Sequence, residues 1–152
     1  MRYLLLVALL LGIGTTTPEL AAQTPAPRPA DPDRDAVQQF VMQLGENINR
    51  NDFAALEAFF PARGVHILTD SVTTHGWAEY RDQHLKPELA RFTGLRYEHT
   101  SIEPVVRGNV AWVAFRRIFT STGPAGSAQG RGSAVLEKRE GRWIIVHLHM
   151  ST

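Results

Sequence analysis

The 152-residue chain contains no cysteine. It can therefore form no disulfide bond, and it offers no cysteine for lipid attachment. It also lacks any excess of charge, because 16 basic and 15 acidic residues leave a formal net charge of +1. The basic residues are scattered, whereas nucleic-acid binding needs a concentrated basic face. We therefore expect neither DNA nor RNA as a partner.

Familiar catalytic motifs are missing as well. The sequence has no phosphate-binding loop, no nucleotide-binding motif and no Ser-His-Asp signature. His147 and His149 could supply two metal ligands from one strand face, but no acidic or histidine neighbour completes a recognised metal signature. We therefore expect no metal and no cofactor, and we assign the two histidines to hydrogen bonding within the sheet or at a subunit interface.

The N-terminus carries an apolar run, Leu4 to Leu11, that is too short to span a bilayer. It follows the positive Arg2 and precedes small residues, a pattern typical of a secretory signal peptide over residues 1–22. We expect this segment to be removed on export to the periplasm or the exterior, with no membrane contact afterwards. Residues 23–33 hold four prolines and no large apolar side chain, which predicts an extended, disordered leader.

The remaining residues, 34–152, are expected to form one domain. Apolar residues recur at helical spacing after Asp33 and Asp35, which predicts a long first helix capped by one of these two aspartates. A short second helix is predicted after Asp52, and a third helix from Trp77. Between them, a short strand is predicted over residues 64–70.

Strand patterns fill the chain from Leu95 onwards. Gly108-Asn109 and Glu140-Gly141 predict tight turns, and residues 120–130 predict a long loop. The result is a four-stranded antiparallel meander after three helices. This order indicates an α+β fold, because the βαβ alternation of a parallel sheet is missing.

The last predicted strand is apolar on both faces, which is typical of a central strand. Because side chains alternate along a strand, one face is expected to carry Trp143, Ile145, His147, His149 and Ser151. The opposite face would carry Ile144, Val146, Leu148 and Met150, and we expect it to lie on the core.

The closing hairpin resembles that of a known family. Its first strand ends in Lys138-Arg139-Glu140-Gly141-Arg142-Trp143, and Val146-His147-x-His149-x-Ser151 follows. This pattern resembles the nuclear-transport-factor-2-like superfamily, and within it the SnoaL-like branch. It is also similar to the association domain of calmodulin-dependent kinases. The resemblance implies a cystatin-like cone, in which a bent antiparallel sheet wraps a long N-terminal helix and leaves a pocket at its open end.

The resemblance also implies pairing through the outer face of the sheet. That would place Trp143, His147 and His149 at a homodimer interface. For the pocket, it favours binding of a small, partly apolar or carboxylate-bearing molecule. The residues expected to contact this ligand are Trp77, Tyr80, His84, Phe115 and Arg116.

Arg116 is chosen from three strand arginines, together with Arg117 and Arg131. Whichever of them points inward would be a buried cation, which is costly without a partner. In the kinase association domain an inward strand arginine helps to bind small carboxylates, and Arg116 is the nearest match by position. Pairing with a glutamate across the sheet is the other interpretation of these arginines.

Two further functions stay open. Isomerases and cyclases of this fold use an inward aspartate, so an enzyme is possible with Asp70 as base and His66 or His84 as its orienting partner. His66 and Asp70 share a predicted strand face. Alternatively, the domain is a purely structural dimerisation module whose interior is filled by side chains. Whether the chain is an enzyme is therefore left open.

Overall fold

The structure, a computed structural model, describes residues 31–70, 72–123 and 126–152. The predicted signal peptide and residues 23–30 of the predicted leader lie outside this part of the chain. Its helical elements are α1 (Pro32–Asn49), α2 (Phe53–Glu57), α3 (Trp77–Tyr80), the π-helical turn η1 (Arg81–Leu85) and α4 (Lys86–Arg91). Its strands are β1 (His66–Thr69), β2 (Val72–Thr74), β3 (Arg96–Arg107), β4 (Val110–Thr120), β5 (Ser127–Arg139) and β6 (Arg142–Ser151). No helix within the described ranges is long and apolar enough to cross a membrane.

Helix α1 begins earlier than its predicted caps. Asp31 is the N-cap, and its carboxylate accepts hydrogen bonds from the backbone N–H groups of Asp33 and Arg34, both at 3.2 Å. Pro32 fits the first turn because its missing N–H would have no partner there. The predicted caps Asp33 and Asp35 are therefore wrong, and α1 begins within the last residues of the predicted leader.

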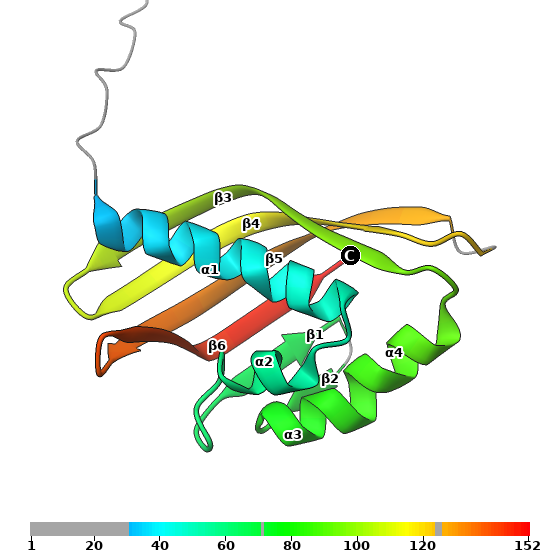
Figure 1. Cartoon of the computed structure of the whole chain (residues 1–152), viewed down its shortest axis with the longest axis horizontal. Helices are drawn as coiled ribbons and strands as arrows, with labels where there is room; N and C mark the ends of the chain where they lie inside the picture. The colour runs from blue at the N-terminus through cyan, green and yellow to red at the C-terminus, as the bar shows by residue number, and fades with distance from the viewer. Residues whose placement is uncertain (1–30, 71, 124–125) are drawn as a thin grey trace, which may run out of the picture.

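The six strands form one curved, open sheet in the order β2-β1-β6-β5-β4-β3 (Figure 1). The antiparallel meander β3 to β6 confirms the α+β prediction, and β6 lies inside the sheet as expected. Two features were not predicted. Strand β1 pairs with β6 in parallel, and β2 forms a hairpin with β1 at the edge of the sheet.

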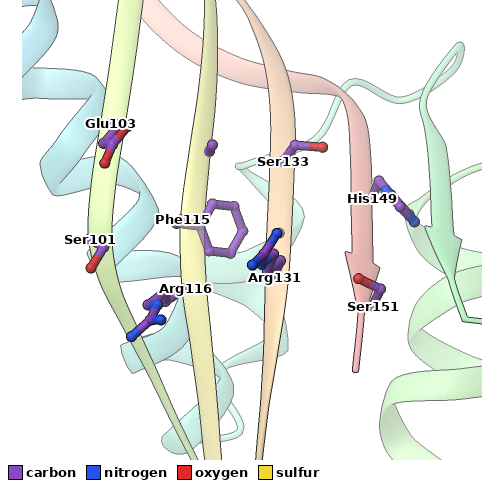
Figure 2. Close-up of a pocket in the computed structure, with 10 residues that line it drawn as sticks. Ser101, Glu103, Phe115, Arg116, Arg131, Ser133, His149 and Ser151 are labelled. Carbon is purple, nitrogen blue, oxygen red and sulfur yellow. The ribbon is translucent and has the colours of Figure 1, made fainter.

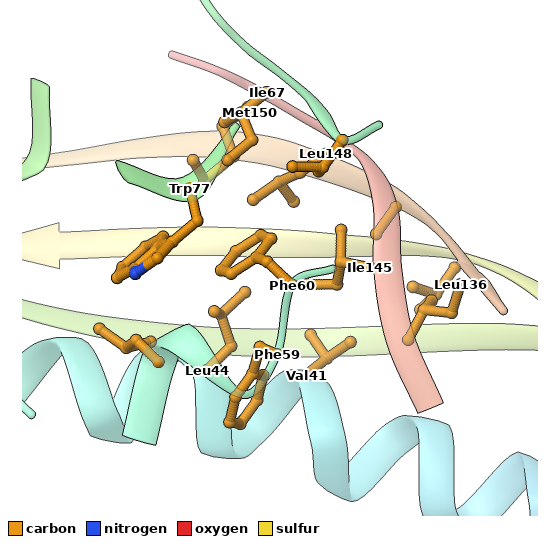
Figure 3. Close-up of a cluster of buried hydrophobic side chains, with 14 of the residues drawn as sticks. Val41, Leu44, Phe59, Phe60, Ile67, Trp77, Leu136, Ile145, Leu148 and Met150 are labelled. Atoms are coloured by element: carbon orange, nitrogen blue, oxygen red, sulfur yellow. The ribbon is translucent and has the colours of Figure 1, made fainter. Parts of the chain in front are cut away.

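Helix α1 lies across one face of the meander, which we call the inner face (Figure 1). Its buried side chains Val37, Val41, Leu44 and Ile48 are the predicted apolar stripe. They join one core cluster with inward side chains from the sheet and from α2 and α3 (Figure 3). The opposite face of the sheet, which we call the outer face, has no helix over it among the described elements.

Strand β6 contains a β-bulge that changes which side chains reach the core. Ile145 lies opposite Leu136 and His147 lies opposite Val135, so Val146 is the extra residue. Before the bulge Trp143 and Ile145 are buried, and after it Leu148 and Met150 are. Figure 3 shows Ile145, Leu148 and Met150 in the core cluster.

The prediction that a single alternation runs through β6 is therefore wrong in its first half. Trp143 is 7% exposed and belongs to the core cluster, so it does not lie on the outer face. His147 and His149 keep their predicted place on the outer face, because they follow the bulge.

The α3–η1–α4 segment crosses the point where Pro87 was expected to kink or restart the helix. Proline has no N–H to donate and crowds the preceding turn. The chain accommodates it with the wider turn η1 directly before α4, so one continuous helical segment results. On its buried side Trp77 stacks on Phe60, with ring centroids 4.9 Å apart. This segment packs beside β1 and β2 at one end of the molecule (Figure 1).

Candidate functional site

Strand β4 carries two adjacent arginines that point to opposite faces of the sheet. Arg117 is buried on the inner face, whereas Arg116 is exposed on the outer face. The prediction that Arg116 lines the interior is therefore wrong, and the next residue, Arg117, takes that place. Phe115 is buried as expected, on the same side as Arg117.

Arg117 is a buried cation with little compensation. It is 7% exposed, its Nε has no hydrogen-bond partner, and it forms no ion pair with any carboxylate of the described residues. Its guanidinium lies 5.4 Å from the ring centre of Tyr97 and 5.9 Å from that of Phe119. Aromatic faces attract a cation, but they replace only part of its lost hydration. Arg117 therefore carries a charge that the side chains in contact with it do not neutralise.

Further buried polar atoms without partners accompany this cation. They include Tyr97 Oη and His99 Nε2 on β3, next to Arg117, and Trp77 Nε1 on α3. His99 and Arg117 are register partners, and Tyr97 lies two residues before His99 on the same face of β3. Buried polar groups in proteins are nearly always hydrogen-bonded, so a group of unpaired ones indicates a missing partner.

The protonation states of the interior follow from burial. Burial raises the pKa of Tyr80 and of Tyr97, and the negative charge of Glu88 raises both further, so the two phenols stay neutral donors. Burial lowers the pKa of His99, which keeps this imidazole uncharged at neutral pH. Two charges act on these phenols: the buried guanidinium of Arg117 and the half-buried carboxylate of Glu88 on α4.

His99 also has a defined tautomer. Its Nδ1 lies 2.9 Å from the backbone oxygen of Val41 on α1. A carbonyl oxygen can only accept, so Nδ1 carries the proton and donates it. Nε2 is then the unprotonated nitrogen, and its lone pair is buried without a partner.

Three of the predicted pocket residues come together on the α3–η1–α4 segment. Trp77 and Tyr80 are buried, with ring centroids 6.2 Å apart. The half-buried His84 stacks on Tyr80 at 5.3 Å and lies 3.6 Å from the carboxylate of Glu88. The positive charge of Arg117 on β4 lowers the pKa of Tyr80 slightly against the larger effect of burial. The Tyr80 phenol is therefore close enough to β4 to feel this charge.

The sequence analysis did not select Tyr97 or His99 for the pocket, and of the strand arginines it chose Arg116 over Arg117. Their signal was the strand alternation, which puts residues 97 and 99 on one face of β3 and residue 117 on the matching face of β4. Phe115, which was predicted, packs on His99 with ring centroids 4.8 Å apart.

Asp70 and His66, the predicted catalytic pair, lie elsewhere. Asp70 is exposed in the turn after β1, where its carboxylate accepts hydrogen bonds from the backbone N–H and the hydroxyl of Thr152. These bonds lower the pKa of Asp70, which is the opposite of what a general base at neutral pH needs. The ring of His66 contacts that of His75, at 5.1 Å. The arrangement gives Asp70 a structural contact with the C-terminus.

No group of three or more histidine, cysteine or acidic side chains in the described part of the chain is arranged to hold a metal ion. His147 and His149 lie on the outer face, and His147 is in register with His66 on β1. Self-association through this face stays a prediction.

The outer face contains a groove of about 640 Å³ that crosses β3 to β6 (Figure 2). Small residues form its centre, where Ala114 lies opposite Ser133. Arg116 and Arg131 lie at one end of the groove, and Glu103 also lines it. This is a different place from the interior around Arg117, because Arg116 and Arg117 project from opposite sides of β4.

Comparisons with known proteins agree with this architecture. The family model of the SnoaL-like domain matches residues 37–152. Similar solved structures include a nuclear transport factor 2-like superfamily protein from Salmonella enterica, with a TM-score of 0.70, 19% identity and coverage of 78% of this chain and 89% of that one. A cystatin-like protein of unknown function from Nostoc punctiforme has a TM-score of 0.69, 14% identity and coverage of 78% and 90%.

A third similar structure is a putative ketosteroid isomerase from Shewanella frigidimarina, with a TM-score of 0.66, 22% identity and coverage of 76% of this chain and 94% of that one. At these identities the likeness shows the fold alone. None of the curated proteins matches the chain.

Proposed function

Because the chain belongs to the SnoaL-like domain family, we propose that it binds a small, partly apolar molecule bearing a carboxylate, held between the inner face of the sheet and the α3–η1–α4 segment. The observation that carries this proposal is Arg117, a buried cation without an anionic partner among the described residues. A ligand carboxylate would supply the missing charge. Arginine suits this task because its planar fork matches the two carboxylate oxygens.

The neighbouring side chains support the same class of ligand. Tyr97 Oη and Trp77 Nε1 are buried donors without partners and could bond a carboxylate or a carbonyl oxygen. Phe119 and Trp77 add apolar surface for the rest of the molecule. The ligand is therefore expected to be an aromatic or alicyclic acid and not a polar one.

The two adjacent arginines provide a matched test. Benzoate is titrated into the wild type, Arg117→Gln and Arg116→Gln, and binding is followed by NMR. We expect Arg117→Gln to weaken binding about tenfold or more, since hydrogen bonds between charged groups contribute about 1.5–3 kcal/mol. Arg116→Gln should bind like the wild type. Equal weakening in both variants, or none in Arg117→Gln, would contradict the proposal.

The second candidate function is that of a proton-transfer enzyme. In this function His99, and not the predicted Asp70, would be the base. Its free Nε2 could take a proton from a carbon next to a ligand carbonyl, while the electron pair moves onto the carbonyl oxygen as an enolate facing Arg117. Return of the proton to a different carbon would complete an isomerisation.

The fold shared with a putative ketosteroid isomerase makes a ketosteroid the first probe. Proton NMR in heavy water would detect deuterium entering the probe, and His99→Asn should abolish this exchange. Exchange at an unchanged rate in His99→Asn would remove His99 from this role.

The site of action is proposed to lie outside the cytoplasm. Support comes from the sequence of residues 1–22 alone, which are typical of a cleaved signal peptide. N-terminal sequencing of protein recovered from the periplasm or medium should begin near Gln23. An intact Met1 in a cytoplasmic fraction would contradict export.

A further inference from the structure

We propose that the interior site, between the inner face of the sheet and the α3–η1–α4 segment, selects a 2-hydroxy acid. The carboxylate of this acid would face Arg117, and its hydroxyl group would donate a hydrogen bond to His99 Nε2. The inference rests on the function proposed above and narrows its ligand class. It starts from two buried side chains, since His99 is 8% exposed and Arg117 is 7% exposed. Neither His99 Nε2 nor Arg117 Nε has a hydrogen-bond partner in the part of the chain that the structure describes.

These two side chains are neighbours, and they differ in what they offer a ligand. His99 on β3 and Arg117 on β4 are register partners, and opposed residues of an antiparallel pair have Cα atoms about 4.5–5.5 Å apart. Arg117 is a cation that only donates. The Nε2 lone pair of His99 only accepts, because Nδ1 holds the proton and donates it to the backbone oxygen of Val41. A carboxylate alone would satisfy the arginine and leave the histidine unpaired.

The imidazole of His99 is fixed in place by its neighbours. A Cβ atom at Gly45 of α1 would lie 3.3 Å from His99 Nδ1, so the missing side chain lets the ring approach the helix closely. The ring of Phe115 packs on the imidazole, with centroids 4.8 Å apart. Phe115 in turn packs against Gly132, where a Cβ atom would overlap the aromatic ring. Together with the hydrogen bond of Nδ1, these contacts give the Nε2 lone pair a defined direction.

The donor that His99 requires is a neutral one. An ammonium group at this place would put a second positive charge beside Arg117, and buried like charges repel strongly. Burial lowers the pKa of His99, so its lone pair is present at neutral pH. A hydroxyl group on the carbon next to a carboxylate puts a neutral donor beside an anion, which matches the two opposed side chains. The aromatic or alicyclic part of the acid would lie against Phe119 and Trp77.

Three related acids test the hydroxyl group at neutral pH, with binding followed by NMR titration. Phenylacetate lacks the hydroxyl group, each enantiomer of mandelate carries it, and α-methoxyphenylacetate has a methyl group in place of its proton. We expect the better-bound enantiomer of mandelate to bind the wild type about tenfold more tightly than either of the other acids. The reason is that these two acids would leave the buried Nε2 without a donor.

Three variants separate this contact from general effects. In His99→Phe the preference for mandelate over phenylacetate should disappear, because the acceptor is lost. His149→Phe removes an exposed histidine of the outer face and should keep the preference. Arg117→Gln should weaken both acids alike and should keep it too. If His99→Phe does not fold, the three acids decide in the wild type, together with nitrogen NMR of the ligand-free protein, which should find the proton of His99 on Nδ1.

Three results would overturn the inference. The first is equal binding of mandelate and phenylacetate by the wild type. The second is an unchanged preference for mandelate in His99→Phe. The third is a proton on His99 Nε2 in the ligand-free protein. In each of these cases the function proposed above survives if binding of phenylacetate depends on Arg117. If the wild type binds none of the acids, that function fails and the inference fails with it.

Discussion

Arg117 places a positive charge in a setting that otherwise consists of aromatic rings and neutral donors. A charge that is 7% exposed has lost most of its hydration, and no carboxylate of the described residues forms an ion pair with it. Without ligand, this arrangement costs stability. Residues retained at such a cost are typical of binding sites, where stability and function are in conflict.

Replacing this arginine by an apolar residue of similar length should therefore stabilise the ligand-free protein. We expect Arg117→Met to raise the free energy of unfolding by about 1 kcal/mol or more. Arg116→Met, on the outer face of the same strand, should change it by less than about 0.5 kcal/mol. Urea unfolding of both variants measures the difference. A loss of stability in Arg117→Met would mean that the contacts with Tyr97 and Phe119 outweigh the buried charge.

Asp70 gives a second prediction, on pH dependence. Hydrogen bonds from Thr152 lower its pKa in the folded state below the ordinary value of 3.8. The carboxylate therefore stabilises the fold at pH values above 3.8, and this contribution is lost as the pH falls through the lowered folded pKa. Asp70→Asn should be less stable than the wild type at pH 7.

The difference between Asp70→Asn and the wild type should shrink towards zero in acid, as measured by thermal unfolding from pH 7 down to pH 3. Carboxyl NMR of the wild type gives an independent check. A raised pKa of Asp70 would contradict its structural contact with Thr152 and restore it as a candidate base.

Among the elements, β3 to β6 were predictable because period-two alternation and glycine-containing turns are local signals. The bulge at Val146 was not, since Ile144, Ile145 and Val146 are all apolar and allow either face to turn inward. Its position depends on the register with β5, which is a long-range pairing. The same holds for the parallel pairing of β1 with β6.

The helical residues of the candidate site could be predicted from the sequence, whereas its strand residues could not, because their place depends on long-range packing. Alternation separates Arg116 from Arg117, yet it does not say which face of β4 meets α1. Both faces carry large apolar residues, such as the exposed Trp112 and the buried Phe115. Trp77, Tyr80 and His84 were identified because helical spacing groups them locally. Tyr97 and His99 reach the interior only through the packing of β3 on α1.

In the part of the molecule that the structure describes, the helices lie on the inner side of the sheet (Figure 1). In the middle of the outer face, Val105, Trp112, Val135 and His147 lie in register across four strands. Trp112 is 47% exposed at the centre of this row. An exposed tryptophan between two valines of the neighbouring strands is typical of an interaction surface. We therefore expect a second copy of the chain to cover the row. Trp143 was predicted to contact this second copy, but it is buried in the core, so Trp112 takes its place in the expected interface.

Trp112→Lys tests this expectation, because a charge in the row should prevent burial of the apolar strip. Analytical ultracentrifugation should find a dimer for the wild type and a monomer for Trp112→Lys. Val72→Lys is the matched control, since Val72 is also a large exposed apolar residue, at 44%, but lies on the edge strand β2. It should remain dimeric. A monomeric wild type, or dissociation caused equally by both lysines, would show that the outer face is not where two copies meet.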